Sequence, residues 1–300
     1  MNNHIKILIY KIIPSWLYYQ IALFIKKKRL KKANKNFRNK NNSKPIFDFL
    51  KKKKNNEKVF IFGSGSTIKE LTLSNFDEID SCYSIGINKW IFHNFIPNCY
   101  MIELTDDDIL NAKFRVRTLA LLKNKSKSPI FLIYRGRLSD PIKLQKWMRG
   151  MNSKRVFLYE YLRPDIFKKN IKSEFVKSLK LLKKNIKSNV LTLGVGATIE
   201  RAISLTLLLG YSKLTILGVD LKNTRYFWND EDSNFKDIRH GQKNYGYHIT
   251  AIKNFGRLPV QESILILDKI AREYYDSRIL ISTNKSLLSS KLEKYKWQNK

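Results

Sequence analysis

The chain has 300 residues and a formal net charge of +33, from 58 Lys and Arg against 25 Asp and Glu. This length allows one or two domains with a buried core, and this charge favours anionic partners such as lipid surfaces, glycans or nucleic acids. The basic residues are spread along the whole chain, and neither zinc-finger spacing nor an RNP-type aromatic motif is present, which argues against a specific nucleic-acid-binding module.

The N-terminal segment is first apolar and then basic. The apolar run Ile5–Ile25 is long enough to span a bilayer, but two lysines and a proline interrupt it, and the basic cluster Lys26–Lys32 follows. No small-residue cleavage site follows, which argues against a cleaved signal peptide. We therefore expect residues 1–32 to form an amphipathic anchor helix at the membrane interface, with packing on the protein's own core as the alternative.

The rest of the chain divides into a linker and one domain. Residues 33–57 are rich in Lys, Asn and Ser, which is typical of a flexible basic linker. From residue 58 onward, short apolar runs alternate with longer amphipathic runs. This pattern predicts a single Rossmann-like α/β domain over residues 58–300, with a mostly parallel sheet covered on both faces. Residues 140–189 are more basic and less regular, and we expect a lid or a helical insertion there.

Expected strands and helices follow from these runs. The strands are Val59–Phe62, Cys82–Ile87, Cys99–Leu104, Pro129–Tyr134, Arg155–Leu158, Leu214–Leu217 and Arg278–Ser282. The helices are Thr67–Leu71, Asp106–Leu122, Pro164–Lys184, Ala197–Leu209 and Val260–Tyr275. The only two cysteines, Cys82 and Cys99, lie in apolar strands, so we expect buried thiols rather than a disulfide. Ligands of such sheets bind at the carboxyl ends of the strands, so the residues that follow each strand are the functional candidates.

The strongest signal is the turn Gly63-Ser-Gly-Ser-Thr67, directly after the first strand. Its glycines allow a tight turn with backbone dihedrals that other residues avoid, and Ser66 and Thr67 are good N-caps for a following helix. Such a helix start exposes N–H groups and a positive dipole end, which together bind anions. We predict that Gly63, Ser64, Gly65 and Ser66 bind a nucleotide phosphate, with a ligand-free turn as the alternative.

Polar residues also follow the second and third strands. Asn88 can donate to and accept from a base or a ribose, or it can serve only as a turn residue. Beyond Glu103, Thr105 is both a candidate nucleotide-binding residue and a candidate helix N-cap. Asp106–Asp108 could hold a divalent metal on a diphosphate, but the helix dipole also favours acids in a first turn. The helix-dipole explanation is the stronger one, so we predict no metal site.

A second loop of small residues, Thr192-Leu-Gly-Val-Gly-Ala-Thr198, leads into an expected helix. This loop can cradle a phosphate or a sugar at the helix start, or it can serve close packing of the helix on the sheet. Thr192 and Gly194 are the nucleotide-binding residues that we predict here.

The strand Leu214–Leu217 is followed by Asp220 and by an aromatic loop that contains Tyr226. A carboxylate beyond a buried strand can accept hydrogen bonds from a hydroxyl-rich ligand, and aromatic rings suit stacking on a sugar. His240 and His248 lie in the polar stretch that follows. Each is a candidate general base, because the usual pKa of histidine lies near neutrality, and an exposed histidine without function is the alternative.

In this order, these pieces resemble the bacterial sialyltransferases that decorate lipooligosaccharide. The likeness covers residues 58–292, and its most specific parts are Gly210-Tyr-Ser-Lys-Leu-Thr-Ile-Leu-Gly-Val-Asp220 and Asn284-Lys-Ser-Leu-Leu288. The resemblance implies a Rossmann-like domain with a lid and inversion at the anomeric centre. It implies a CMP-linked donor whose sugar is sialic acid or a related acidic sugar. It also implies that neither a cofactor nor a metal is used.

The resemblance also implies roles for single residues. The Gly63–Gly65 turn and Asn88 would hold the nucleotide. His248 would be the base that deprotonates the acceptor hydroxyl, and Tyr226 would steady the departing phosphate. We add Asp220, the carboxylate beyond the buried strand, to the catalytic set.

The sequence departs from that family in three places. The family's Asn-Pro-Ser after the third strand is Glu103-Leu-Thr105 here, and its Thr-Ser-Gly before the long helix is Thr192-Leu-Gly194. The insertion Phe255–Pro259 leaves open whether His240 or His248 is the base. Families that share the first motif are the alternatives, namely Mg²⁺-dependent pterin pyrophosphokinase-like enzymes and motility-associated glycosyltransferases. A non-catalytic membrane- or nucleic-acid-binding module would explain only the charge.

The sequence thus predicts a transferase of cell-surface lipopolysaccharide or polysaccharide biosynthesis. It would be cytoplasmic and peripheral on the inner face of the cytoplasmic membrane. Its partners would be a nucleotide-sugar donor, a glycan or lipid-linked acceptor and an anionic membrane surface. A homo-oligomer is left open.

Overall fold

The computed structural model describes residues 13–36, 50, 57–104, 112–123, 130–134, 156–166, 169–186, 190–222, 226–228, 248–251 and 258–298. Several segments considered above lie outside the described residues. They are residues 1–12, most of the linker, Thr105 with Asp106–Asp108, His240, and part of the expected lid.

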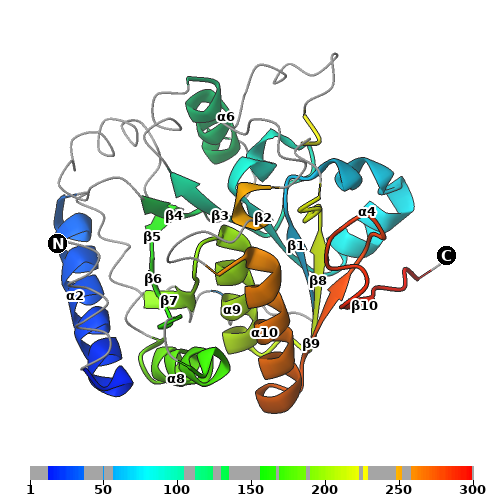
Figure 1. The fold of residues 1–300 in the computed structure, drawn as a ribbon. Coiled ribbons are helices and arrows are strands. Elements are labelled where there is room, and N and C mark those ends of the chain that lie inside the picture. The colour runs from blue at the N-terminus through cyan, green and yellow to red at the C-terminus, as the bar shows by residue number, and fades with distance from the viewer. Residues whose placement is uncertain are drawn as a thin grey trace.

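The centre of the molecule is a parallel sheet. Its eight described strands have the order β10-β9-β8-β1-β2-β3-β4-β5, and every pair of neighbours is parallel (Figure 1). The strands are β1 (Lys58–Phe62), β2 (Tyr83–Ile87), β3 (Cys99–Leu104), β4 (Ile130–Tyr134), β5 (Val156–Leu158), β8 (Lys213–Leu217), β9 (Arg278–Ile281) and β10 (Glu293–Lys294). The central strands are buried along almost their whole length, because helices cover the sheet.

A small second sheet and the helices complete the fold. The second sheet pairs β6 (Glu160–Leu162) with β7 (Val190–Leu193). The helices are α2 (Ser15–Asn36), α4 (Leu73–Asp80), α6 (Ala112–Lys123), α8 (Ile171–Lys184), α9 (Thr198–Leu209) and α10 (Val260–Tyr274), with short 3₁₀ helices η2 (Ser66–Glu70), η3 (Asn88–Phe92) and η6 (Ile249–Ala251). Every residue of α9 is buried, since this helix packs between the sheet and α10.

The strand order determines where a ligand crevice lies. From β1 the chain moves through β2 to β3 on one side, whereas β8 and β9 continue on the other side. The neighbours β1 and β8 therefore send their loops in opposite directions. Ligands of doubly wound sheets bind in the crevice that such a reversal leaves at the carboxyl ends of the strands.

The structure confirms a single α/β domain with a mostly parallel sheet. Each expected strand is present, with both ends within one residue of the expected range. Cys82 and Cys99 are buried and do not form a disulfide, as expected. The helix expected from Pro164 begins only at Ile171, because Asn170 caps it by accepting the Ser173 N–H at 3.0 Å.

Other elements were not expected from the sequence. They are α4, β6, β7, β10 and the 3₁₀ helices η3 and η6, all of them short. Among the described residues of the expected lid, β6 and α8 pack into the body of the domain. A lid therefore remains a prediction only for the residues that the structure does not describe.

The helix α2 packs on the domain beside α8, β6 and β7 (Figure 1). Tyr19 and Leu23 are each only 2 % exposed and belong to the packed interior. The structure therefore shows the packing on the protein's own core that was the alternative to a separate anchor helix. None of the described helices combines the length and the apolarity needed to cross a bilayer.

Candidate active site

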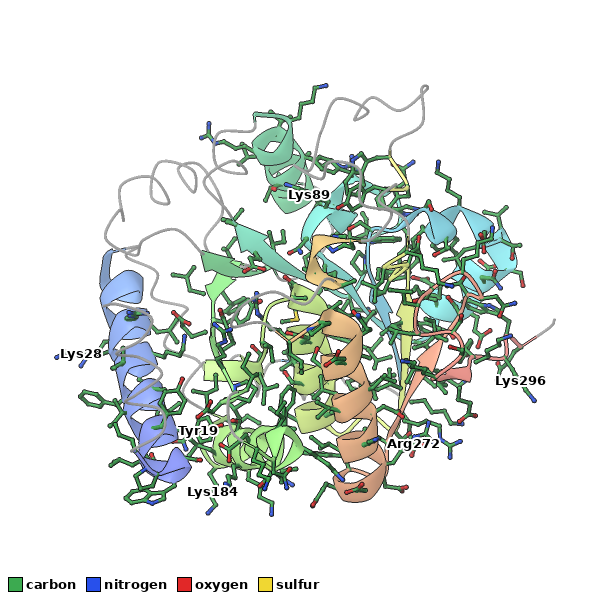
Figure 2. All side chains as sticks on the ribbon, viewed as in Figure 1. Tyr19, Lys28, Lys89, Lys184, Arg272 and Lys296 are labelled. Carbon is green, nitrogen blue, oxygen red and sulfur yellow. The ribbon has the colours of Figure 1, made fainter. Side chains whose placement is uncertain are left out.

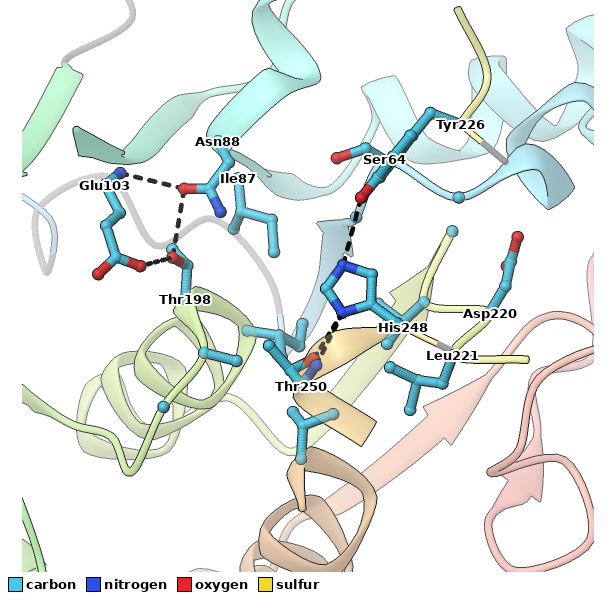
Figure 3. A pocket seen from close by; sticks show the side chains of 18 residues that line it. Ser64, Ile87, Asn88, Glu103, Thr198, Asp220, Leu221, Tyr226, His248 and Thr250 are labelled. Atoms are coloured by element: carbon cyan, nitrogen blue, oxygen red, sulfur yellow. Dashed lines mark hydrogen bonds between the residues drawn. The ribbon is translucent and has the colours of Figure 1, made fainter. Parts of the chain in front are cut away.

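A cavity of about 190 Å³ lies at the carboxyl ends of β1, β2, β3 and β8 (Figure 3). It is lined by Gly63–Gly65, Ile87, Asn88, Glu103, Gly196–Ile199, Gly218–Leu221, Tyr226, His248, Thr250 and Val260. This is the crevice that the reversal of strand order predicts. Segments that are far apart in the sequence therefore meet at one place.

Close approach explains the glycines after β1. In register, Phe62 lies opposite Leu217, so Gly63 runs beside Gly218. A Cβ on Gly63 would approach the Gly218 carbonyl and Val219 to less than 3 Å. Neither Gly63 nor Gly65 has a positive φ, and φ is −68° at Gly65. The expectation of dihedrals that other residues avoid is therefore wrong, and tight packing against the β8 loop takes its place.

Asp220 closes the turn after β1. This carboxylate is 3 % exposed and accepts the Thr67 N–H at 3.2 Å, the Thr67 hydroxyl and, at 3.4 Å, the Ser66 hydroxyl. A Cβ on Gly65 would overlap the same carboxylate. The start of η2, which we expected to bind a ligand phosphate, thus donates an N–H to a carboxylate of the protein itself. Ser64 lines the pocket, whereas the side chain of Ser66 is bonded to Asp220.

The C-terminal motif Asn284–Leu288 holds the Asp220 loop in place. The Ser286 hydroxyl donates to the Val219 carbonyl at 2.6 Å, and the Leu287 N–H donates to the Asp220 carbonyl at 3.1 Å. Leu221, which follows, has a positive φ of 61°. The motif is therefore a support of the pocket wall.

The loop before α9 also surrounds a carboxylate. Glu200 is fully buried, and its Oε2 accepts the N–H groups of Val195, Gly196 and Ala197 at 2.7, 2.9 and 3.1 Å. Ser263 of α10 donates its hydroxyl to the other oxygen. The expected second phosphate cradle is thus filled by Glu200.

The two predicted residues of this loop are not at the pocket. Thr192 is fully buried, and Gly194 packs against the side chain of Arg201. The later residues Gly196–Ile199 line the pocket instead.

A polar network forms one wall. The Asn88 Oδ1 accepts the Glu103 N–H at 3.0 Å. The Thr198 hydroxyl lies 3.2 Å from the same oxygen and 3.0 Å from the Glu103 carboxylate. Arg201, fully buried in α9, pairs with that carboxylate at 3.1 Å. Asn88 has a positive φ of 49°, which asparagine tolerates better than most residues. Because its oxygen is used within the wall, its amide Nδ2 is the group that can meet a ligand.

The opposite side of the pocket carries Tyr226 and His248. The Tyr226 hydroxyl lies 3.3 Å from His248 Nε2, and Thr250 Oγ1 lies 2.7 Å from His248 Nδ1 (Figure 3). The ring of Tyr226 stacks on buried Trp228, with centroids 4.7 Å apart, and Tyr226 forms a β-bridge with Gly65. The stacking on Trp228 and the bridge to Gly65 therefore hold the Tyr226 hydroxyl at the pocket.

The protonation of His248 follows from its surroundings. Burial lowers the pKa of this imidazole, so the ring is neutral at pH 7. Thr250 offers Nδ1 two partners, an N–H at 3.3 Å that can only donate and a hydroxyl at 2.7 Å that can donate or accept. The site accommodates both neutral tautomers. With the hydrogen on Nδ1, the imidazole donates to the Thr250 hydroxyl and Nε2 becomes an acceptor.

Sequence reasoning missed several residues of the site. Glu200 carries a local signal, because a Glu three residues after the N-cap is typical of a capping box. Arg201 carries none, since its partner Glu103 lies far away in the sequence, and Thr250, two residues after His248, has no pattern that marks it as a partner of the imidazole. Among the predicted residues, the structure brings Gly63, Ser64, Gly65, Asn88, Asp220, Tyr226 and His248 together at the pocket.

Comparisons with known proteins find similarity only among solved structures. No protein-family model matches the chain, and no curated protein matches it. The monofunctional α-2,3-sialyltransferase Cst-I from Campylobacter jejuni is 15% identical, with a TM-score of 0.45, over 80% of this chain and 81% of that one. The sialyltransferase CstII from Campylobacter jejuni, in complex with cytidine-5′-monophosphate, is 12% identical, with a TM-score of 0.40, over 79% and 84%.

A third similar structure is the MAf glycosyltransferase from Magnetospirillum magneticum AMB-1. It is 17% identical, with a TM-score of 0.38, and the match covers 79% of this chain and 34% of that one. Identities and TM-scores in this range do not establish a shared activity.

Proposed function

We propose that the protein is a glycosyltransferase that moves a sugar from a nucleotide donor to a hydroxyl of a cell-surface lipooligosaccharide or polysaccharide. The donor is CMP-linked, and its sugar is sialic acid or a related acidic sugar. The observation that carries this proposal is the pocket at the reversal of strand order, where Tyr226 and His248 stand 3.3 Å apart opposite the polar wall of Asn88. Such crevices are where doubly wound sheets bind nucleotides.

The pocket offers separate groups for the donor and for the chemistry. The Asn88 amide and Ser64 supply hydrogen bonds to the nucleotide, and the Gly63–Gly65 backbone leaves room for it. Asp220 acts here as a positioning residue, because its carboxylate already binds Thr67. We no longer assign nucleotide contacts to Thr192 and Gly194, which do not line the pocket.

The reaction is a single displacement. The acceptor oxygen attacks the anomeric carbon, the bond from that carbon to the phosphate oxygen breaks, and the nucleotide leaves with the electron pair. His248 takes the acceptor's proton, for which it must be neutral at the start. Burial keeps it neutral at pH 7 by lowering its pKa. The Tyr226 hydroxyl donates to the departing phosphate, and neither metal nor cofactor takes part.

A transfer assay tests this proposal. We expect the purified protein to release CMP from a CMP-linked acidic sugar and to add the sugar to a lipooligosaccharide acceptor, with the same rate in the presence of a chelator. A requirement for Mg²⁺ together with pyrophosphate transfer to a pterin would instead identify a pyrophosphokinase. Transfer to a flagellin acceptor alone would identify a motility-associated glycosyltransferase.

The same proposal places the enzyme at the inner face of the cytoplasmic membrane. A lipid-linked acceptor is presented at that surface, and an enzyme held there meets it at a high local concentration. The apolar and basic N-terminal sequence supports this location.

A further inference from the structure

The helix α2 exposes a cluster of large apolar side chains. Trp16 is 66 % exposed, Phe24 is 65 % exposed, and Ile21 and Ile25 are each 43 % exposed. These are half of the large apolar side chains that are exposed among the described residues, and the others are scattered over different elements. Single exposed apolar residues are ordinary, but a contiguous cluster marks an interaction surface.

Three of these apolar residues and a lysine form one face of the helix, whereas Trp16, seven residues before buried Leu23, lies at the helix start on the side of the packed face. Ile21, Phe24, Ile25 and Lys28 are spaced as i, i+3, i+4 and i+7, so their side chains lie along one side. Figure 2 shows Lys28 pointing away from the domain and Tyr19 pointing toward it. Beyond the apolar part, exposed basic residues continue along the helix at Lys28, Arg29 and Lys31.

The opposite face fixes α2 to the domain. The Tyr19 hydroxyl donates to Glu174 of α8 at 2.8 Å and accepts the Asp165 N–H at 2.9 Å. Lys26 pairs with Glu160 of β6 at 2.8 Å, and Lys27 donates to Asn185 at 2.9 Å. A helix held by these contacts cannot leave the domain without breaking buried hydrogen bonds, so its outer face is a rigid part of the protein surface.

The charges decide which partner this face fits. An apolar strip that continues into exposed lysines and arginine matches the boundary between the acyl region and the phosphates of an anionic bilayer. A second copy of the chain would bring a like basic row against this one, and each copy carries a net charge of +33, which disfavours that pairing.

We infer that the outer face of α2, formed by Ile21, Phe24, Ile25 and Lys28, is a docking surface for an anionic lipid bilayer. The helix lies in the interface while its inner face stays packed on β6, β7 and α8. The domain is therefore held on the membrane in one orientation, rather than tethered by a separate anchor. This inference does not depend on the reaction catalysed in the pocket.

Vesicle binding by the full chain tests the inference. We compare vesicles of phosphatidylcholine with vesicles that also contain phosphatidylglycerol. The double variant Ile21→Ser/Phe24→Ser should bind the anionic vesicles at least ~10-fold more weakly than the native protein, since it loses most of the apolar surface of this face. The control Leu73→Ser/Val116→Ser removes two residues that are at least as exposed, 85 % and 64 %, on α4 and α6, and should bind as the native protein does.

A tryptophan placed on this face reports its position. On anionic vesicles the emission of a Phe24→Trp variant should shift to the blue by more than that of the native protein, with binding retained. Native-like binding by the Ile21→Ser/Phe24→Ser variant, or equal binding of the native protein to neutral vesicles, would overturn the inference. So would a change from dimer to monomer in that variant by light scattering, because the face would then join two copies.

Discussion

In the proposed reaction His248 accepts the proton of the acceptor hydroxyl, and it can do so only while its imidazole is neutral. Replacing it by alanine should lower the rate of transfer ~10²–10⁴-fold, as expected for loss of a positioned base, while donor binding persists. His248→Gln should be as inactive, because the glutamine amide can hydrogen-bond to Tyr226 but cannot take up a proton. The control His240→Ala should transfer sugar at nearly the native rate.

The pH dependence of the transfer rate is a second test of this role of His248. Burial lowers the pKa of His248, so the neutral form persists to a lower pH than in an ordinary histidine. The rate of the native enzyme should therefore fall on the acid side, at a pH below the usual histidine range. A His248→Gln variant with native activity would show that the imidazole serves only as a donor to Tyr226.

Thr250 positions that imidazole. When Nδ1 carries the hydrogen, the Thr250 hydroxyl, 2.7 Å away, accepts it and leaves Nε2 free, which is the tautomer required of a base. Thr250→Val should lower the rate about 10-fold with little change in donor affinity, and Thr250→Ser should restore it. The ¹⁵N shifts of His248 should show more Nε2–H tautomer in the valine variant. Unchanged shifts would assign Thr250 to packing alone.

At the scale of elements, the start of α9 depends on one buried carboxylate. Glu200 accepts three N–H groups of the preceding loop and the Ser263 hydroxyl, which ties α9 to α10. Glu200→Gln replaces one acceptor oxygen by a donor, and urea unfolding should report a loss of about 2–3 kcal/mol. Glu262→Gln, at an exposed position in the first turn of α10, is the matched control and should change little. Equal stability of the two variants would contradict the role assigned to Glu200.

The turn after β1 shows what the sequence could and could not predict. The apolar strand and the requirement for small residues were readable, because both are local. The partner that requires them was not, because Asp220 lies far along the chain and reaches Gly65 only through the β1–β8 pairing. Valine at Gly65 would collide with this carboxylate, so a loss of nucleotide binding in that variant would not identify a phosphate contact.

The pocket as a whole was partly predictable for the same reason. Asn88, Tyr226 and His248 were found because each follows a strand or lies in a polar loop, and the parallel sheet gathers such positions. The pairing of Glu103 with Arg201 was not readable, since a lysine- and arginine-rich chain offers many candidates for one carboxylate.

At the scale of the whole molecule, α2 is both a part of the core and a part of the surface. The sequence is apolar on both sides of this helix, so periodicity could not distinguish an anchor from a core helix. The buried residues Tyr19 and Leu23 decide the question in favour of packing.

Removal of this helix should therefore harm the fold. A chain that begins after Lys32 exposes the surfaces of β6, β7 and α8 that α2 covers, and we expect aggregation or a clearly lower melting temperature. Tyr19→Phe, which leaves Glu174 and the Asp165 N–H without this hydroxyl, should cost about 1–3 kcal/mol in urea unfolding. A truncated chain as stable as the full one would show that α2 is an independent anchor.

The central claim is that the pocket between β1 and β8 binds the nucleotide of the donor, and calorimetry with CMP, UMP, GMP and AMP tests it most directly. We expect the native protein to bind CMP best. Asn88→Gly, which tolerates the positive φ and removes the amide, and Tyr226→Phe should each weaken CMP binding about 10-fold. Tyr274→Phe, at a tyrosine 53 % exposed on α10 and not part of the pocket lining, should bind as the native protein does. Native-like affinity in both pocket variants, or no binding of any nucleotide, would contradict the account.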